Sequence, residues 1–142
     1  MNIEECLKEG YLKRIKPSKD LVEKEFKEAE YDLGKAKSSI HEEDFKWAVI
    51  KAYYSIFHSA RAAVFSLGYR ESKHFAIQVV LEELSKKGQI DSEYVDYFSA
   101  AMEARENADY RYTYSKETAE DIIEYAEKFL EEIKGFCRRI RV

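Results

Sequence analysis

Apolar residues recur every three or four positions along most of the chain, which is the spacing of one helix face. Between residues 18 and 40 these positions are Val22, Phe26, Ala29, Leu33, Ala36 and Ile40. The same rhythm predicts helices over 42–67 and 72–87, and further helices that begin near 91 and near 115. Gly68 and Gly88 are the expected ends of two of them. Asn2 followed by Glu5 indicates a short capped helix before Pro17.

Turn-forming residues are scarce, since the 142-residue chain has one proline and five glycines. A sandwich or barrel of many short strands needs more of them. Short connections between long helices make successive helices antiparallel neighbours. We therefore predict an all-α fold, an antiparallel up-down bundle of four main helices plus a short N-terminal accessory helix. The N-terminal arm would cover residues 1–17, and the bundle domain residues 18–142.

The net charge of −4 and the pI near 5.5 exclude a uniformly basic nucleic-acid binder, so any phosphate site must be local. No DNA-specific signal is found. Cys6 and Cys137 have no ligand-like spacing, so neither a metal nor another cofactor is expected. Two free thiols, no apolar signal-peptide core and no run of about 20 apolar residues predict a cytoplasmic protein outside the membrane.

Arg105 breaks the apolar pattern of the helix that begins near 91. The inward positions Phe98, Ala101 and Met102 lead next to Arg105, where an apolar residue is expected. A charge at a core position is costly unless it is paired or solvated. Asp109, four residues later, offers an internal ion pair. The alternative is an anion site, because a guanidinium matches the oxygens of a phosphate.

The predicted helix over 42–67 has a second apolar face opposite its main stripe. Another helix of the same bundle is the usual cover for such a face. The alternative is a homodimer interface, since tryptophan, tyrosine and arginine are typical anchors. The residues assigned to that interface are Trp47, Ile50, Tyr54, His58, Arg61 and Phe65.

His58 is a candidate acid or base because its ordinary pKa, about 6.5, lies near neutrality. It lies one turn after Tyr54 and about one turn before Arg61, so the three side chains point to a common side. A histidine among aromatic residues is more often a packed, hydrogen-bonded residue than a catalytic one.

Three segments together resemble the HEPN domain family, over roughly residues 20–132. They are AYYSIFHSARAAVFSLGY at 52–69, SKH at 72–74 and RENADY at 105–110. The likeness is strongest to small stand-alone prokaryotic HEPN proteins. It implies an antiparallel helical bundle, commonly homodimeric, with a cleft associated with nucleotides or RNA. Many such proteins pair with a minimal nucleotidyltransferase (MNT) as toxin and antitoxin.

The ribonuclease members of the family carry a histidine four to six residues after the arginine that Arg105 matches. Here those positions hold Tyr110, Arg111 and Tyr112. Cleavage without a metal needs a base for the 2′-hydroxyl and an acid for the leaving oxygen, and arginine supplies neither. His58 or a tyrosine is a candidate substitute for that role, and a tyrosine with a pKa near 10 is a poor base at neutral pH.

We therefore expect a nucleotide- or RNA-binding module with an MNT partner. The residues expected to form its nucleotide- or phosphate-binding site are Arg105, Asn107, Asp109, Tyr110, Arg111, Tyr112 and Tyr54. One alternative is a metal-independent ribonuclease toxin that uses Arg105 with a non-standard acid or base, for which His58 is the candidate. The other is a structural interaction protein without catalytic activity, in which Arg105 and Asp109 satisfy each other.

Overall fold

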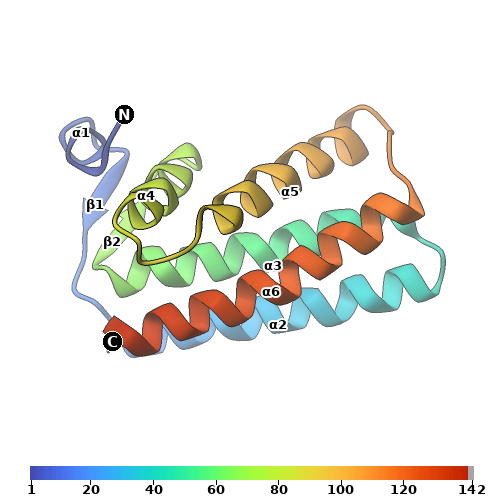
Figure 1. The fold of residues 1–142 in the computed structure, drawn as a ribbon, viewed down its shortest axis with the longest axis horizontal. Helices are drawn as coiled ribbons and strands as arrows, with labels where there is room; N and C mark the ends of the chain where they lie inside the picture. The colour runs from blue at the N-terminus through green and yellow to red at the C-terminus, as the bar shows by residue number, and fades with distance from the viewer. Residues whose placement is uncertain (141–142) are drawn as a thin grey trace.

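The computed structural model describes residues 1–140, and helices dominate it (Figure 1). In chain order the elements are α1 (Ile3–Lys8), β1 (Leu12–Arg14), α2 (Lys19–His41), α3 (Phe45–Ser66), β2 (Tyr69–Glu71), α4 (Phe75–Lys86), α5 (Ser92–Tyr110) and α6 (Lys116–Ile140). The predicted all-α bundle is confirmed. The described part has six helices, namely the four long helices α2, α3, α5 and α6, the 12-residue α4 and the short α1. Residues 141 and 142 of the predicted domain lie outside it.

α3 is the central helix, and α2, α5 and α6 pack around it. Figure 1 shows α2 and α6 running alongside α3, while α5 slants away from α3 toward the C-terminal end of α5. Ile56 and Phe65 of α3 are fully buried, as are Phe98 of α5 and Phe129 of α6. A helix enclosed on several sides needs more than one apolar face, which explains the two stripes that the sequence carries here.

Side-chain caps fix where the long helices begin. Ser18 Oγ accepts a hydrogen bond from the backbone N–H of Leu21, and Asp44 Oδ1 accepts one from that of Trp47. Such caps satisfy amide groups that have no partner within the helix. α3 therefore starts at Phe45 rather than at residue 42, because the chain turns first through Glu43, whose φ is +62°.

A two-stranded antiparallel ribbon joins the N-terminal arm to the bundle. Leu12 lies opposite Glu71, and Arg14 lies opposite Tyr69. Gly68 precedes β2 with a φ of +83°, and a Cβ there would lie 3.2 Å from the Ile15 carbonyl oxygen. The sequence pattern predicted neither strand, because three residues are too few for a clear alternation.

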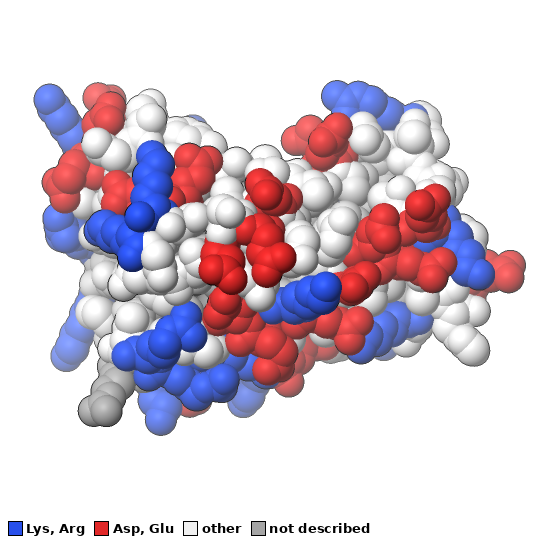
Figure 2. Space-filling model, in the orientation of Figure 1, with Lys and Arg blue, Asp and Glu red and all other residues white. Residues whose placement is uncertain are grey.

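The surface carries its charges in separate regions. Acidic side chains spread over the middle of the face in Figure 2, while lysines and arginines gather where α6 ends and α2 begins. Lys19, Lys134 and Arg138 belong to that basic end. Within residues 1–140, every helix is too short or too polar to cross a bilayer.

Candidate functional site

Arg105 lies among three tyrosine rings on the side of α5 that faces α3. Its guanidinium carbon is 5.7 Å from the ring centre of Tyr53, 5.9 Å from that of Tyr54 and 5.2 Å from that of Tyr110. A cation within about 6 Å of an aromatic face is attracted by the ring quadrupole. Since the side chain of Arg105 is 23% exposed, it borders the surface.

The hydrogen-bonding capacity of Arg105 is only partly used. Its Nη2 lies 3.2 Å from Asp109 Oδ2, and its buried Nε has no hydrogen-bond partner among residues 1–140. Burial works against the charged form, but Tyr54, Tyr110 and Asp109 outweigh it and raise the pKa of Arg105. The guanidinium is therefore a permanent cation with donors to spare for an anion.

Tyr54 and Tyr110 expose part of their rings beside this cation, at 36% and 64% of their surface. Tyr53 is buried, and burial raises the pKa of its phenol. The structure thus brings together Arg105, Asp109, Tyr54 and Tyr110, four of the predicted binding residues. Tyr53 was missed because nothing in the sequence pattern shows that its buried ring lies against Arg105.

Asn107 and Arg111 pair with each other and not with Arg105. Arg111 Nη1 donates to Asn107 Oδ1 at 2.9 Å, near the C-terminal end of α5. Residues two apart on a helix point in very different directions, so Asn107 faces a pocket between α5 and α6. Arg111 is exposed, and its place in the predicted set stays a prediction.

Tyr112 lies in the turn after α5 with a φ of +53° and is 77% exposed. Lys46 Nζ, from the start of α3, lies 5.7 Å from the Tyr112 ring centre and 5.8 Å from that of Trp47. The lysine thus forms cation–π contacts with two exposed aromatic residues of different segments. Sequence analysis missed Lys46, because only tertiary structure brings residue 112 to it.

His58 is held by two carboxylates of α2. Its Nδ1 lies 2.6 Å from Glu25 Oε2, and its Nε2 lies 3.6 Å from Asp32 Oδ2. The hydrogen bond with Glu25 raises the pKa of His58, although burial opposes this. Burial also raises the pKa of Asp32, and His58 partly offsets that effect. Both ring nitrogens of His58 therefore face acids rather than the Arg105 site.

Arg61, one turn further along α3, extends this network. Its Nη1 lies 3.4 Å from Glu25 Oε1, and its Nε lies 2.9 Å from Glu71 Oε2. The Glu71 side chain is only 6% exposed, and Arg61 Nε is buried without a well-aligned hydrogen bond. Because the N–H of Arg61 Nε does not point well at the Glu71 oxygen, the two groups form an ion pair without a good hydrogen bond. The network connects α2, α3 and β2.

The six residues predicted for an interface do not share one environment. Ile50 and Phe65 are 3% and 1% exposed, so other parts of the same chain already cover them. Trp47 and Tyr54 are 46% and 36% exposed. His58 and Arg61 are partly buried by the network described above. The open part of this face therefore consists of Trp47 and Tyr54, close to Arg105 and Lys46.

Residues 1–140 contain no group of three or more histidine, cysteine or acidic side chains that is arranged to hold a metal ion. The closest approach is His58 with Glu25 and Asp32, where the imidazole forms contacts with both acids itself. The groups that surround Arg105 are the carboxylate of Asp109 and the phenols of Tyr53, Tyr54 and Tyr110.

Comparison of the sequence with known protein families identifies the family of this chain. The model of the HEPN domain matches residues 22–136. The chain belongs to the HEPN domain family. This HEPN match covers most of the chain, including α3, α5 and every predicted site residue, and it leaves α1 and β1 outside.

Two proteins of Methanocaldococcus jannaschii are similar to this HEPN protein. One, named "Putative toxin MJ0142", is 28% identical over 118 residues, which are 81% of this chain and 80% of that protein. The other, named "Putative toxin MJ0605", is 32% identical over 114 residues, which are 79% of this chain and 85% of that protein. In each case the similarity covers about four-fifths of this chain and at least that share of the relative.

Proposed function

We propose that this HEPN protein is a toxin-like module that binds a nucleotide or RNA through its phosphate groups at Arg105. The observation that carries the proposal is the incomplete pairing of the Arg105 guanidinium at the surface. Its Nη2 lies 3.2 Å from one carboxylate oxygen of Asp109, and Nη1 has no ion-pair partner within residues 1–140, while Nε is buried without a partner. Phosphate oxygens match such a fork of donors, and charge-assisted bonds of this kind are strong.

The aromatic residues around Arg105 support RNA or a nucleotide over inorganic phosphate. Tyr54 and Tyr110 expose ring surface within about 6 Å of the cation, and nucleobases stack on such rings. Tyr112, which Lys46 contacts, adds a further exposed ring. Stacking of this kind tolerates different bases, because each base has a π-face. We therefore propose that the site recognises the phosphate and a stacked base rather than a particular sequence.

A metal-independent ribonuclease toxin is the second candidate, because both relatives from M. jannaschii bear toxin names. Cleavage would need a proton acceptor beside the 2′-hydroxyl. His58, the proposed acid or base, forms its polar contacts with Glu25 and Asp32 instead. Release of His58 from Glu25 would have to precede any role in catalysis. We therefore favour binding over cleavage.

We further propose that the protein acts in the cytoplasm as a homodimer, paired with a minimal nucleotidyltransferase as toxin and antitoxin. The dimer proposal rests on exposed Trp47 and Tyr54, since such aromatic residues anchor interfaces. The nucleotidyltransferase follows from the resemblance to small prokaryotic HEPN proteins. Copurification of this chain with a nucleotidyltransferase encoded beside it tests this partner, and failure of the two coexpressed chains to associate would exclude it.

Fluorescence anisotropy with a labelled single-stranded RNA, in the presence of chelator, tests the proposed function. Wild type is expected to bind, and Arg105→Ala to bind at least about tenfold more weakly, since charged hydrogen bonds contribute about 1.5–3 kcal/mol. Arg14→Ala removes the same charge from an exposed side chain of β1 and serves as the control. Equal affinity of all three proteins would refute the binding site. Shortened RNA in the same samples, separated on a gel, would favour the ribonuclease.

A further inference from the structure

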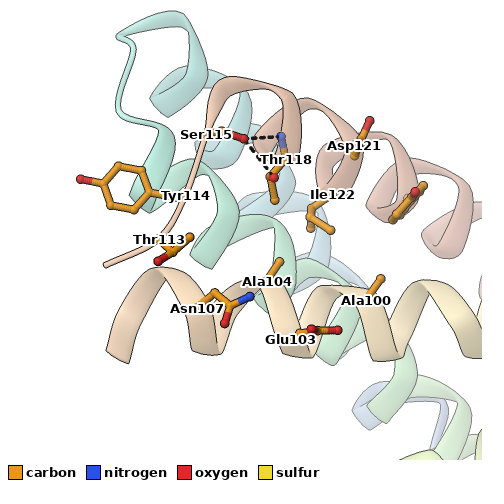
Figure 3. A pocket seen from close by; sticks show the side chains of 11 residues that line it. Ala100, Glu103, Ala104, Asn107, Thr113, Tyr114, Ser115, Thr118, Asp121 and Ile122 are labelled. Atoms are coloured by element: carbon orange, nitrogen blue, oxygen red, sulfur yellow. Dashed lines mark hydrogen bonds between the residues drawn. The ribbon is translucent and has the colours of Figure 1, made fainter. Parts of the chain in front are cut away.

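A second candidate site lies on the opposite side of α5 from Arg105. It is a pocket of about 330 Å³ between α5 and the start of α6 (Figure 3). Residues 100, 103, 104 and 107 of α5 line it and share one helix face. Each residue turns a helix by about 100°, so Arg105 and Asp109 point away from this pocket. The two sites are therefore separate.

The pocket has acidic character. Glu103 of α5 and Asp121 of α6 line it from two sides, and no lysine, arginine or histidine is among its lining residues. Within residues 1–140, neither carboxylate lies within ion-pair distance of a basic side chain. These charges repel phosphate, so the pocket does not extend the nucleotide site. They attract a cation instead.

An aromatic wall and an apolar floor accompany the two acids. Tyr125 lines the pocket and stacks on Tyr97 with a ring separation of 4.3 Å and an interplanar angle of 9°. The stack holds the Tyr125 ring in place. Ala104 and Ile122, both buried, line the pocket beside it. A planar cation is attracted to the face of an aromatic ring such as that of Tyr125. The aliphatic part of a long basic side chain can pack on apolar residues such as Ala104 and Ile122.

The N-terminal turn of α6 is also fixed at this pocket. Ser115 Oγ accepts a hydrogen bond from the backbone N–H of Thr118 at 3.1 Å and lies 3.0 Å from its hydroxyl oxygen. Figure 3 shows this pair at the rim, with Asp121 one turn further on. A rigid rim means that a ligand need not order the site before it binds.

We propose that this pocket receives an arginine side chain from a protein partner. A guanidinium is planar and always charged, so it can lie against the Tyr125 ring while its charge is attracted by the acidic lining, whereas a lysine ammonium is a compact point charge. The cavity lies at the small end of the range of about 300–1,000 Å³ typical of small-molecule sites. That volume suits one inserted side chain. Arginine is also a frequent anchor residue at protein interfaces.

The test uses N-acetyl-arginine amide as the probe and N-acetyl-citrulline amide as its uncharged isostere. Two-dimensional NMR of the full chain follows backbone amides of residues 100–107 and 113–125 during titration. A saturable shift with the arginine probe, and none with citrulline, is the expected result. The double variant Glu103→Gln and Asp121→Asn should bind the arginine probe about tenfold more weakly, because each half-exposed ion pair contributes up to about 1 kcal/mol.

Glu120→Gln removes one charge from the exposed side of α6 outside the pocket and should leave the shifts unchanged. Arg105→Ala should also leave them unchanged, so this proposal and the RNA-binding proposal fail independently. Equal shifts with citrulline, or an equal loss in Glu120→Gln, would overturn the arginine site. Saturable shifts of the same amides with AMP would overturn it too, because the occupant would then be a nucleotide.

Discussion

The imidazole of His58 lies 2.6 Å from the Glu25 carboxylate and thereby ties the central helix α3 to α2. Asp32 lies 3.6 Å from the other ring nitrogen, and Glu28 adds a further negative charge from α2. Arg61 is the cation that shares Glu25 with the imidazole. The protonated form of His58 is thus the one that this part of the bundle favours.

We predict that this contact stabilises the fold in a pH-dependent way. The hydrogen bond with Glu25 raises the pKa of His58 in the folded state above its unfolded value of about 6.5. The added stability is therefore complete below that unfolded pKa and disappears as pH rises through the folded pKa. Urea unfolding near pH ~5.5 should show His58→Gln to be less stable than wild type by about 1–2 kcal/mol.

The difference in unfolding free energy between His58→Gln and wild type should shrink as the pH is raised into the alkaline range. His41→Gln provides the control, because His41 is exposed at the end of α2. A difference that stays constant with pH would mean that His58 acts through packing and not through its charge.

Arg61 and Glu71 give a second stability prediction. Glu71 is 6% exposed and has Arg61 Nε at 2.9 Å, so removal of the cation leaves a buried carboxylate uncompensated. Arg61→Met should lower the free energy of unfolding by about 3 kcal/mol, measured in urea. Glu71→Gln added to this variant should restore part of the loss, because the uncompensated charge is then gone. No recovery in the double variant would show that the packing of Arg61 on Phe57 and Phe65 dominates.

Asp109 competes with an incoming phosphate for the guanidinium of Arg105. Asp109→Asn should therefore raise the affinity for single-stranded RNA about two- to fivefold, since a partly exposed ion pair contributes up to about 1 kcal/mol. Anisotropy measures this change. Asp96→Asn, an exposed charge removal on the same helix, controls for the general loss of negative charge. A fall in affinity as large as that of Arg105→Ala would mean that Asp109 positions the arginine instead.

The proposed dimer interface depends on the exposed rings of Trp47 and Tyr54. Light scattering should give twice the chain mass for wild type and the mass of one chain for the double variant Trp47→Asp, Tyr54→Asp. Tyr31→Asp, at a ring on α2 that is 59% exposed, is the matched control and should stay dimeric. An unchanged mass for the double variant of a dimeric wild type would place the interface elsewhere.

The helices could be predicted from the sequence because their buried faces repeat over many turns. Gly68 and Gly88 also marked two helix ends, and both have positive φ angles in the structure. The ribbon of β1 and β2 could not be predicted, since it depends on pairing between segments more than fifty residues apart. The signals at its two ends predicted a separate helix over 72–87, which the structure has as α4. The number of main helices in the bundle was predicted as four.

The site was predictable only in part. Arg105 was identified because it interrupts an apolar stripe, and its ion pair with Asp109 was one of the two alternatives considered. The partners of His58 could not be predicted, because a helical pattern gives the face of a side chain and not the residue opposite it. Glu25 and Asp32 look like solvated residues of α2 in the sequence, and only tertiary packing brings them to His58.

The salt dependence of RNA affinity tests the role of Arg105 most directly. Affinity falls as salt rises, and each phosphate contact on a single strand makes the slope of log K against log salt concentration steeper by about 0.7. If the guanidinium of Arg105 holds a phosphate, the slope for Arg105→Ala should be shallower than that for wild type by about 0.7. Equal slopes for the two proteins would contradict the account, because the arginine would then have no part in phosphate binding.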